Sequence, residues 1–399
     1  MAAVKLSDKI YSVGVQNPDL RVFDIVMATK YGTSYNSYVV KGEEVALIEA
    51  SHADFEGEYE ANIREAVDPS KIKYIILNHT EPDHSGALRD LLKLCPEATV
   101  LATAVALNYL KNIVNEPFKS RPVKDGEVLD LGGVTLTFAP SPLLHWPDSM
   151  FTYCPEEKTL FSCDVFGSHY SSESILDKDI KNVDGYKEAF KGYYDAIFGP
   201  FKPFVVAGMA KIAKFPFETV CPSHGPVLTK DGQLPYVLDS YRTWSKVAKN
   251  AVKTVPVFYC SAYGCTAKLA KAIADGVKEV IPDAACETYN IIENDMADMR
   301  AKINSCDACA IGSPTLNSDA VPPVWDLLAG VDAINSRKKP VAVFGSYGWS
   351  GEAVPNLIAR VNGLKMAVVG EGFKVCFVPT DAELEAAKEY GRQLASAIK

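Results

Sequence analysis

Short apolar runs alternate with longer polar segments through the first 250 residues of the chain. Several of these runs have the length and composition of buried strands: Val45–Ala50, Lys73–Asn78, Ala98–Thr103, Val134–Pro140 and Thr159–Asp164. The segment Phe55–Val67 instead has apolar residues spaced to bury one face of a helix. These patterns predict sheets covered by helices, which is an α/β arrangement.

A more regular pattern follows the polar segment Arg242–Thr254. Four further apolar runs are predicted as strands: Thr254–Cys260, Ala308–Pro314, Pro340–Ser346 and Phe373–Pro379. Helical segments such as Thr266–Val280 separate them, and this alternation predicts a doubly wound parallel sheet. We therefore predict two domains, residues 1–250 and 254–399.

The composition is that of an ordinary globular protein, with 48% hydrophobic and 23% charged residues. The net charge of −9 disfavours nucleic acid and anionic membrane surfaces as partners, because both attract clustered basic residues. The start, MAAVKLSDKIYSVGV, lacks the features of a secretory signal, and no apolar run is long enough to cross a membrane. We expect a cytoplasmic protein whose ten cysteines are mostly thiols.

Cys306 and Cys309 form an isolated CxxC pair. Such a pair can have a redox or metal-binding role, but a metal site usually needs a second pair. Cys309 also falls in the apolar run of a predicted strand. We therefore favour a packing role for both cysteines.

The stretch NHTEPDHSG, residues 78–86, places four metal-ligating side chains directly after a buried strand and before a helix predicted over Ser85–Leu94. Alternate residues of an extended segment point the same way, so His79, Glu81 and Asp83 are expected to converge on one cavity. The full candidate set is His79, Glu81, Asp83, His84, His145, Asp164 and His224.

Taken singly, each of these residues is more often a hydrogen-bonded turn residue than a ligand. Together they offer four imidazoles and three carboxylates, and the Asp164 carboxylate can bridge two ions. This donor set predicts a binuclear metal site with open positions for a substrate. Glu81 adds a hard anionic donor to the imidazoles, which suits iron without excluding zinc or manganese. The carboxylates also favour the ferric state, so we expect redox chemistry.

A source of electrons is predicted in the second half of the chain. The hydroxyl-rich loop Ser261–Thr266 joins a strand to a helix, where backbone amides and hydroxyls can bind a phosphate. A Walker lysine pattern is absent, which disfavours nucleoside triphosphates. The loops Gly312–Pro322 and Gly345–Ala353 also follow strands, and Tyr347 and Trp349 can flank a flat aromatic ring.

The three loops together predict an FMN site. The residues expected to contact the cofactor are Ser261, Ala262, Tyr263, Gly264, Cys265, Thr266, Ser313, Pro314, Thr315, Asn317, Ser346, Tyr347, Gly348, Trp349 and Gly351.

With these motifs the whole chain resembles the flavodiiron proteins, also called A-type flavoproteins. The resemblance implies a metallo-β-lactamase-like αββα sandwich followed by a flavodoxin-like doubly wound parallel sheet. It also implies FMN and two iron ions in a non-haem di-iron centre. By resemblance, the first iron takes His79, Glu81 and His145, the second takes Asp83, His84 and His224, and Asp164 bridges them.

A member of this family is expected to pass electrons from FMN to the di-iron centre and to reduce dioxygen to water, nitric oxide to nitrous oxide, or both. The resemblance implies an external electron donor such as rubredoxin or a reduced deazaflavin. It further implies a head-to-tail homodimer, or a tetramer of two such dimers. The flavin of one subunit would then lie against the di-iron centre of the other.

Two other classes of protein fit parts of the sequence. A binuclear zinc hydrolase with an accessory flavodoxin-like module would use the same histidines, whereas a pure electron carrier would not need seven converging ligands. His169 and Tyr194 can orient ligands from outside the metal site, with packing as the alternative. Some relatives have a histidine where this chain has Asp24, so we assign no proton-transfer role at that position.

Overall fold

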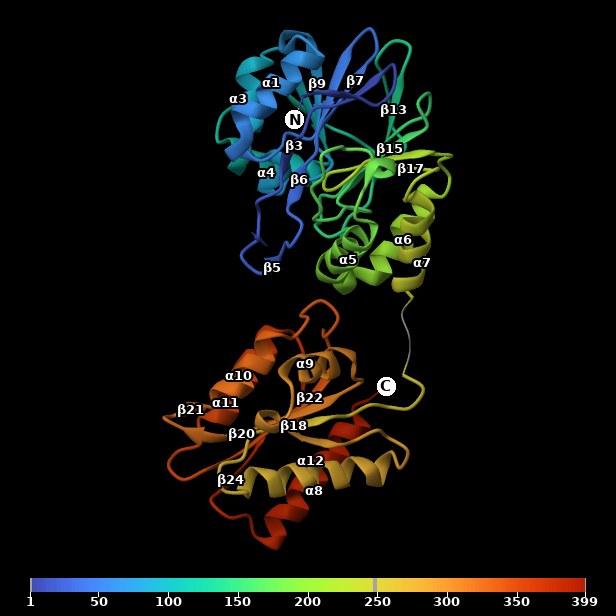
Figure 1. Ribbon diagram of the computed structural model, residues 1–399. Helices are drawn as coiled ribbons and strands as arrows, with labels where there is room; N and C mark the ends of the chain where they lie inside the picture. The colour runs from blue at the N-terminus through green and yellow to red at the C-terminus, as the bar shows by residue number, and fades with distance from the viewer. Residues whose placement is uncertain (1, 247–249, 399) are drawn as a thin grey trace. The chain divides into compact units, whose positions relative to one another are not determined.

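The computed structural model describes residues 2–246 and 250–398. The chain folds as two compact units, Met1–Val247 and Ala248–Lys399, and each unit has its own hydrophobic cores (Figure 1). The exact domain ends, 1–250 and 254–399, stay a prediction because residues 247–249 lie outside the described part of the chain.

The first unit contains two sheets. The first sheet has the order β1 (Val4–Lys5), β2 (Ile10–Ser12), β7 (Tyr38–Lys41), β8 (Val45–Ile48), β9 (Ile72–Ile76), β10 (Thr99–Ala102) and β11 (Ser120–Pro122). The second has the order β12 (Val128–Asp130), β13 (Thr135–Pro140), β14 (Met150–Cys154), β15 (Thr159–Cys163), β16 (Thr219–Pro222) and β17 (Leu228–Thr229). Two short pairs complete the unit: β3 (Val15–Asn17) with β6 (Thr33–Tyr35), and β4 (Val22–Phe23) with β5 (Met27–Ala28).

Helices cover the outer face of each sheet. The first sheet packs against α1 (Glu56–Ala66), α3 (Leu88–Leu94) and α4 (Ala104–Val114), and the second against α5 (Val183–Tyr193), α6 (Lys202–Ile212) and α7 (Leu234–Trp244) (Figure 1). Successive strand residues point to opposite faces, so Val39 joins the core under the helices whereas Val40 joins the core between the sheets. The predicted αββα sandwich is therefore confirmed.

The second unit is built on one parallel sheet of order β19 (Thr288–Asn290), β18 (Val257–Tyr259), β20 (Cys309–Leu316), β22 (Pro340–Tyr347) and β23 (Ala367–Val368). The strand β24 (Phe373–Cys376) also pairs with β22, and the short β21 (Asp319–Ala320) folds back on β20. One face carries α8 (Cys265–Val280) and α12 (Asp381–Ser396), and the other carries α9 (Met296–Ser305), α10 (Pro322–Ala329) and α11 (Ala353–Gly363). The predicted doubly wound sheet is confirmed.

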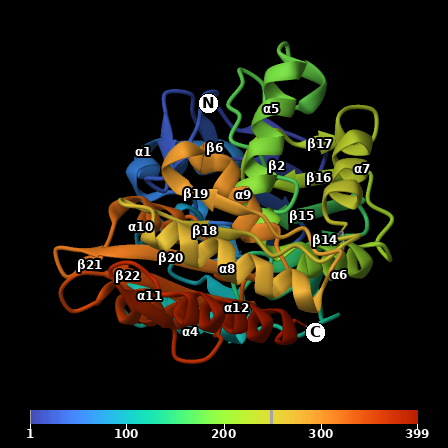
Figure 2. The ribbon, with the colours of Figure 1, turned by 90° about the horizontal axis from the view of Figure 1, so that it is seen from below.

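Helices α8 and α12 approach each other closely, as Figure 2 shows. A Cβ atom on Gly276 would lie 1.9 Å from the backbone oxygen of Lys388, and one on Gly391 would lie 2.1 Å from that of Ile273. Only glycine fits at these two crossing points. This packing fixes α8, whose first turn follows the loop 261–264.

Across the described residues, no helix is both long enough and apolar enough to span a membrane.

Candidate metal centre

The first four candidate ligands lie where β9 ends and a short helix begins. His79 and Glu81 follow the strand, and α2 (Pro82–Ser85) carries Asp83 and His84. The continuous helix predicted over Ser85–Leu94 is wrong, because α2 ends at Ser85 and α3 starts at Leu88. Proline at the first position of α2 favours this early start. Asp83 therefore leaves the extended segment, and strand alternation does not set the direction of its side chain.

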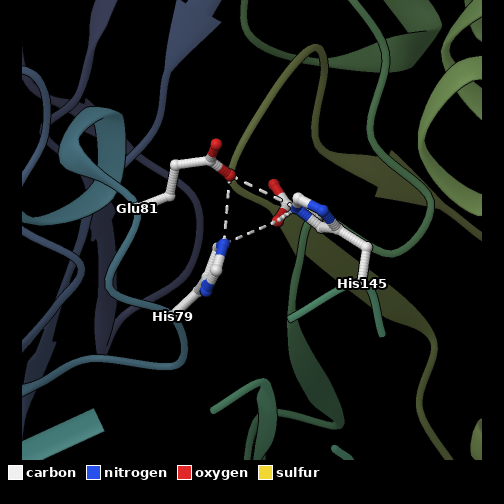
Figure 3. A group of neighbouring side chains, drawn as sticks. His79, Glu81 and His145 are labelled. Atoms are coloured by element: carbon white, nitrogen blue, oxygen red, sulfur yellow. Dashed lines mark hydrogen bonds and ion pairs between the residues drawn. The ribbon is translucent and has the colours of Figure 1, made fainter. Parts of the chain in front are cut away.

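His79, Glu81, His145 and Asp164 form a first group of converging side chains (Figure 3). Glu81 Oε2 lies 3.2 Å from His79 Nε2 and 3.3 Å from His145 Nε2. Asp164 Oδ2 lies 3.2 Å from His145 Nε2 and 3.8 Å from His79 Nε2. Two imidazole nitrogens and two carboxylate oxygens thus face one small volume.

Asp83, His84 and His224 form a second group on the other side of Asp164. His224 Nε2 lies 3.0 Å from Asp83 Oδ2, and His84 Nε2 lies 3.6 Å from Asp83 Oδ1. Asp164 Oδ1 is 3.1 Å from His84 Nε2 and 3.5 Å from His224 Nε2. The two Asp164 oxygens therefore face different groups, as a bridging carboxylate requires.

The chemistry of this donor set fits a pair of cations. Both oxygens of Asp83 and the Nε2 atom of His84 are buried without a hydrogen-bond partner. Within the described residues, no lysine or arginine forms an ion pair with Glu81, Asp83 or Asp164. Because buried carboxylates are costly without a compensating charge, cations at these two positions would satisfy the side chains.

The histidines and carboxylates strongly perturb one another when no metal is bound. Burial alone would raise the pKa of Glu81, but hydrogen bonds from His145 and His79 outweigh burial and lower it to about 2. Burial alone would lower the pKa of His79, but hydrogen bonds to Asp148 and Glu81 raise it to about 9. The metal-free site therefore holds imidazolium and carboxylate pairs, and metal ions would displace the imidazolium protons.

The Nδ1 atoms of three histidines face oxygen atoms outside the two groups. His79 Nδ1 lies 3.2 Å from both oxygens of Asp148, and His224 Nδ1 donates to the Ser34 carbonyl at 2.6 Å. His84 Nδ1 lies 3.8 Å from Glu49 Oε2. These partners hold each ring so that its Nε2 atom faces the cluster.

Of the two alternatives considered for Tyr194, the structure supports packing rather than ligand orientation. Its hydroxyl hydrogen-bonds to Ser245 Oγ at 2.8 Å, whereas the preceding Tyr193 donates to Asp164 Oδ1 at 3.1 Å. The chain forms a π-helical turn over Tyr194–Phe198, directly after α5. Tyr193 is the last residue of α5 and Tyr194 is the first residue of the π-turn, and successive helical residues point in different directions. The register of α5 therefore decides which tyrosine faces the metal groups.

His169 does lie beside the second group. Its ring centroid is 5.4 Å from that of His224 and 4.8 Å from that of Tyr193, and its Nδ1 atom is 2.9 Å from Thr33 Oγ1. Burial and the nearby His224 lower the pKa of His169 to about 3. His169 is therefore a neutral imidazole that packs against a proposed ligand.

The β4–β5 hairpin forms one wall of a cavity of about 290 Å³ that reaches the metal groups. Phe23, Asp24, Tyr35, Glu81 and Asp83 are among its lining residues. Burial, together with the charges of Glu81 and Asp83, raises the pKa of Asp24. This cavity gives a small molecule a path to the carboxylates of the metal groups.

The second unit has a cavity of about 370 Å³ at the ends of β18, β20 and β22. The predicted residues that line it are Ala262, Tyr263, Cys265, Pro314, Thr315, Asn317, Ser346, Tyr347, Gly348 and Trp349. Tyr263 and Trp349 are 92% and 88% exposed, so aromatic surface is available to a planar ligand. The sheet order changes direction next to β18, which is where ligands of doubly wound sheets bind.

Some predicted flavin contacts do not line this cavity: Ser261, Gly264, Thr266, Ser313 and Gly351. Their interactions stabilise the surrounding loops instead. Ser261 Oγ accepts from the Ala267 amide, Thr266 Oγ1 hydrogen-bonds to Ser346 Oγ, and Ser313 Oγ accepts from the Val321 amide. The sequence did not predict four residues that do line the cavity: Leu316, Ser318, Glu352 and Phe377.

Comparisons with known proteins account for both units. Residues 33–225 match the ODP family beta lactamase model, and residues 257–391 match the flavodoxin model. The chain is 46% identical over 400 residues to "Flavo-diiron protein FprA2" from Clostridium acetobutylicum, and the match covers 100% of both chains. The chain belongs to the flavodiiron protein family.

Two further flavodiiron relatives cover almost the whole chain. A "Nitric oxide reductase" from Moorella thermoacetica is 34% identical over 99% of this chain and 98% of its own length. The solved structure of rubredoxin oxygen:oxidoreductase from Desulfovibrio gigas has a TM-score of 0.67 at 28% identity and covers 99% of this chain and 98% of its own. The predicted family, fold class and oxidoreductase class are thereby confirmed.

Flavodiiron membership also decides between the two metal pairs considered from the sequence, which were two iron ions and two zinc ions. The family name specifies a flavin and two iron ions, and the structure contains a candidate site for each. The relatives are reductases, which favours the redox interpretation over a zinc hydrolase. The cofactors of this flavodiiron protein are therefore FMN and a non-haem di-iron centre.

Three buried residues at the metal centre were not predicted from the sequence: Glu49, Asp148 and Tyr193. Glu49 is the next-to-last residue of the predicted strand Val45–Ala50 and directly follows β8, so its position near a strand end was a usable signal. Asp148 lies only three residues after His145, in the same loop. Tyr193 had no comparable signal, because its contact with Asp164 depends on the helix register.

Proposed function

We propose that this flavodiiron protein passes electrons from FMN to its di-iron centre, which reduces dioxygen to water, nitric oxide to nitrous oxide, or both. The observation that supports this proposal best is the Asp164 carboxylate, whose two oxygens face two separate groups of ligands. A pure electron carrier would have no use for such a site. Both gases have support from relatives, since one relative is named a nitric oxide reductase and another an oxygen oxidoreductase.

The distances between donor atoms assign the seven candidate ligands to two metal positions. We assign His79, Glu81 and His145 to one iron, Asp83, His84 and His224 to the other, and Asp164 to both. When bound, the di-iron centre supplies the redox chemistry at the open positions between these ligands. His84 is included because its Nε2 atom faces both Asp83 and Asp164.

The protein's own groups prepare this site in several ways. Asp148 and the Ser34 carbonyl orient two of the proposed ligand imidazoles, and the Tyr193 hydroxyl donates to the proposed bridging carboxylate. Phe23 packs its ring 4.3 Å from His169 and 5.7 Å from His224 and gives the cavity beside the metal groups an apolar wall. Hydrogen-bond donors that are already in place and apolar walls reduce how far polar groups and water must rearrange during the reaction.

The proposed FMN contacts are the loops 261–266, 313–317 and 346–351 around the second cavity. We assign the phosphate of FMN to the N-terminus of α8, where Ala262 and Cys265 line the cavity. The hydroxyls of Ser261 and Thr266 hold the loop around this position. Trp349 and Tyr347 line the cavity and offer aromatic surface to the flavin ring.

We propose a rubredoxin or a reduced deazaflavin as the donor, and the name of the Desulfovibrio gigas relative supports the first of these. We propose a head-to-tail homodimer, which can pair into a tetramer, because closed two-fold assemblies are common. All ten cysteines are free thiols, which supports a reducing, cytoplasmic location.

A mixing experiment tests the function and the assembly together. Asp164→Ala should abolish gas reduction and leave the flavin absorbance unchanged, because Asp164 belongs to the other unit. A second variant with bulky substitutions in Ser261–Thr266 should lose FMN and activity. After dissociation and reassociation, mixed dimers should regain part of the activity with dioxygen or nitric oxide.

The controls separate the two parts of the proposal. If Asp164→Ala retains full gas reductase activity, the proposed metal centre is wrong. If the mixture stays inactive despite mass-spectrometric proof of subunit exchange, the head-to-tail arrangement is wrong, while the function of the parent enzyme is unaffected.

A further inference from the structure

Cys306 and Cys309 lie in the second unit, in the turn that leads from α9 into β20. Cys306 caps the C-terminus of α9, and Cys309 is the first residue of the central strand. Their thiols hydrogen-bond to each other, and Cys306 Sγ also donates to the Ile303 carbonyl at 3.2 Å. The packing role favoured from the sequence accounts for Cys309 but not for the direct pairing of two thiols.

A buried ammonium group lies beside the two thiols. Lys339 is only 9% exposed, and its Nζ donates to the carbonyls of Ile303 at 2.7 Å and Asn304 at 3.0 Å. Within the described residues it has no carboxylate partner among the ion pairs, which is unusual for a buried lysine. Cys306 Sγ and Lys339 Nζ donate to the same carbonyl oxygen, so the ammonium lies near the Cys306 sulfur and would stabilise a thiolate once the proton leaves.

The electrostatics of the pair agree with this geometry. The hydrogen bond with Cys309 lowers the pKa of Cys306, and although burial opposes it, Lys339 lowers the pKa further. The hydrogen bond with Cys306 and burial raise the pKa of Cys309. Cys306 is also the more accessible thiol, with 5% exposure against 0% for Cys309, so a small oxidant reaches Cys306 first.

The turn itself is held firmly. The Asp307 amide donates to the Thr254 carbonyl at 3.0 Å, and its carboxylate accepts from the Thr254 amide and the Asn250 side chain, both at 2.9 Å. These bonds fix Asp307, one of the two residues between the cysteines. Because the turn is fixed, the two cysteines stay close to each other.

We propose that Cys306 and Cys309 form a redox-active dithiol, which hydrogen peroxide oxidises to a disulfide. The Cys306 thiolate attacks one peroxide oxygen, which forms an S–O bond, breaks the O–O bond and releases hydroxide that takes up a proton. The Cys309 sulfur then attacks the sulfenic acid sulfur and releases the second water. Two thiols lose two electrons, and one peroxide becomes two waters. A dithiol reductant reverses the reaction.

Peroxide suits this site because of its size and its origin. Cys306 is only 5% exposed, so a reagent the size of peroxide has access that a protein thiol lacks. Peroxide also forms when dioxygen receives two electrons instead of four. The inference does not rest on the proposed gas reductase activity, because every group involved belongs to the second unit.

Mass spectrometry of the oxidised holoenzyme, kept without an electron donor, tests the proposal. Trypsin releases residues 303–337 as one peptide that contains both cysteines and no other. After peroxide treatment and alkylation, this peptide should carry no alkyl groups and should weigh two hydrogen atoms less. The reaction should be about tenfold or more faster than the loss of the buried Cys286 thiol, and dithiothreitol should reverse it.

Variants assign the roles of the individual groups. Cys309→Ser should stop at a sulfenic acid that dimedone traps at Cys306, and Cys306→Ser should abolish the fast reaction. Lys339→Met should slow disulfide formation about tenfold, with the exposed neighbour Lys338→Met as the matched control. Retention of both thiols under conditions that oxidise the exposed Cys376 would overturn the proposal, as would direct overoxidation without a disulfide.

Discussion

Replacing Asp148 with Asn tests whether a carboxylate outside the proposed ligand set controls one metal position. Asp148 is fully buried, both of its oxygens lie 3.2 Å from His79 Nδ1, and Oδ2 also accepts from Thr80 Oγ1 at 2.7 Å. Asparagine keeps the size and one acceptor but removes the charge. The His79 imidazole then becomes a poorer donor with a less constrained ring.

The expected loss of iron affinity follows from the loss of this single interaction between Asp148 and His79. Loss of a partner that orients a metal-bound histidine typically weakens metal affinity by about 10- to 100-fold, which is about 1.4 to 2.8 kcal/mol. The ion held by His79, Glu81 and His145 should be affected, whereas the second ion should keep its affinity. Asp148→Asn should therefore lose about one of the two iron ions during competition with a chelator.

The assay is an anaerobic titration of metal-free protein with ferrous iron against a chelator of known affinity. Flavin absorbance serves as an internal control, because the FMN site belongs to the other unit. Asp177→Asn is the matched control, since Asp177 is also buried and accepts from the backbone and side chain of Thr229, apart from either metal group. Unchanged affinity for both ions in Asp148→Asn would refute the assigned role.

The remaining predictions concern pH and the bridging carboxylate. In metal-free protein the Glu81 pKa of about 2 is below its ordinary 4.5, so its stabilisation is complete above 4.5 and is lost as pH falls toward 2. The His79 pKa of about 9 is above its ordinary 6.5, so its stabilisation is complete below 6.5 and is lost as pH rises through 9. The Tm of metal-free protein should therefore be highest between about pH 4.5 and 6.5, and a flat profile to pH 9 would contradict this. Tyr193→Phe removes the hydrogen bond to Asp164 and should lower kcat about tenfold with iron content retained, whereas Tyr194→Phe should leave kcat unchanged; equal effects would contradict the assignment.

The sequence determined the two folds and most of the candidate ligands because these depend on local patterns. Strand alternation and buried runs such as Lys73–Asn78 are properties of neighbouring residues. His79 and Glu81 follow β9, and Asp164 follows β15, so these candidate ligands could be recognised at strand ends. The flavin loops follow β18, β20 and β22 of one parallel sheet, whose strand ends meet at one edge. The order of residues along the chain was therefore enough to predict a metal site and a flavin site.

Only the tertiary structure decided which side chains belong to each metal group and which neighbouring residues orient them. Proline-initiated α2 turned Asp83 away from the strand direction, and the register of α5 placed Tyr193 rather than Tyr194 at Asp164. Asp148 meets His79 across 69 residues of chain, a contact that no local pattern encodes. The same holds for Lys339, whose ammonium lies beside Cys306 only because β22 pairs with β20. Such contacts depend on strand order, helix register and turn geometry, which are fixed by packing over the whole unit rather than by neighbouring residues.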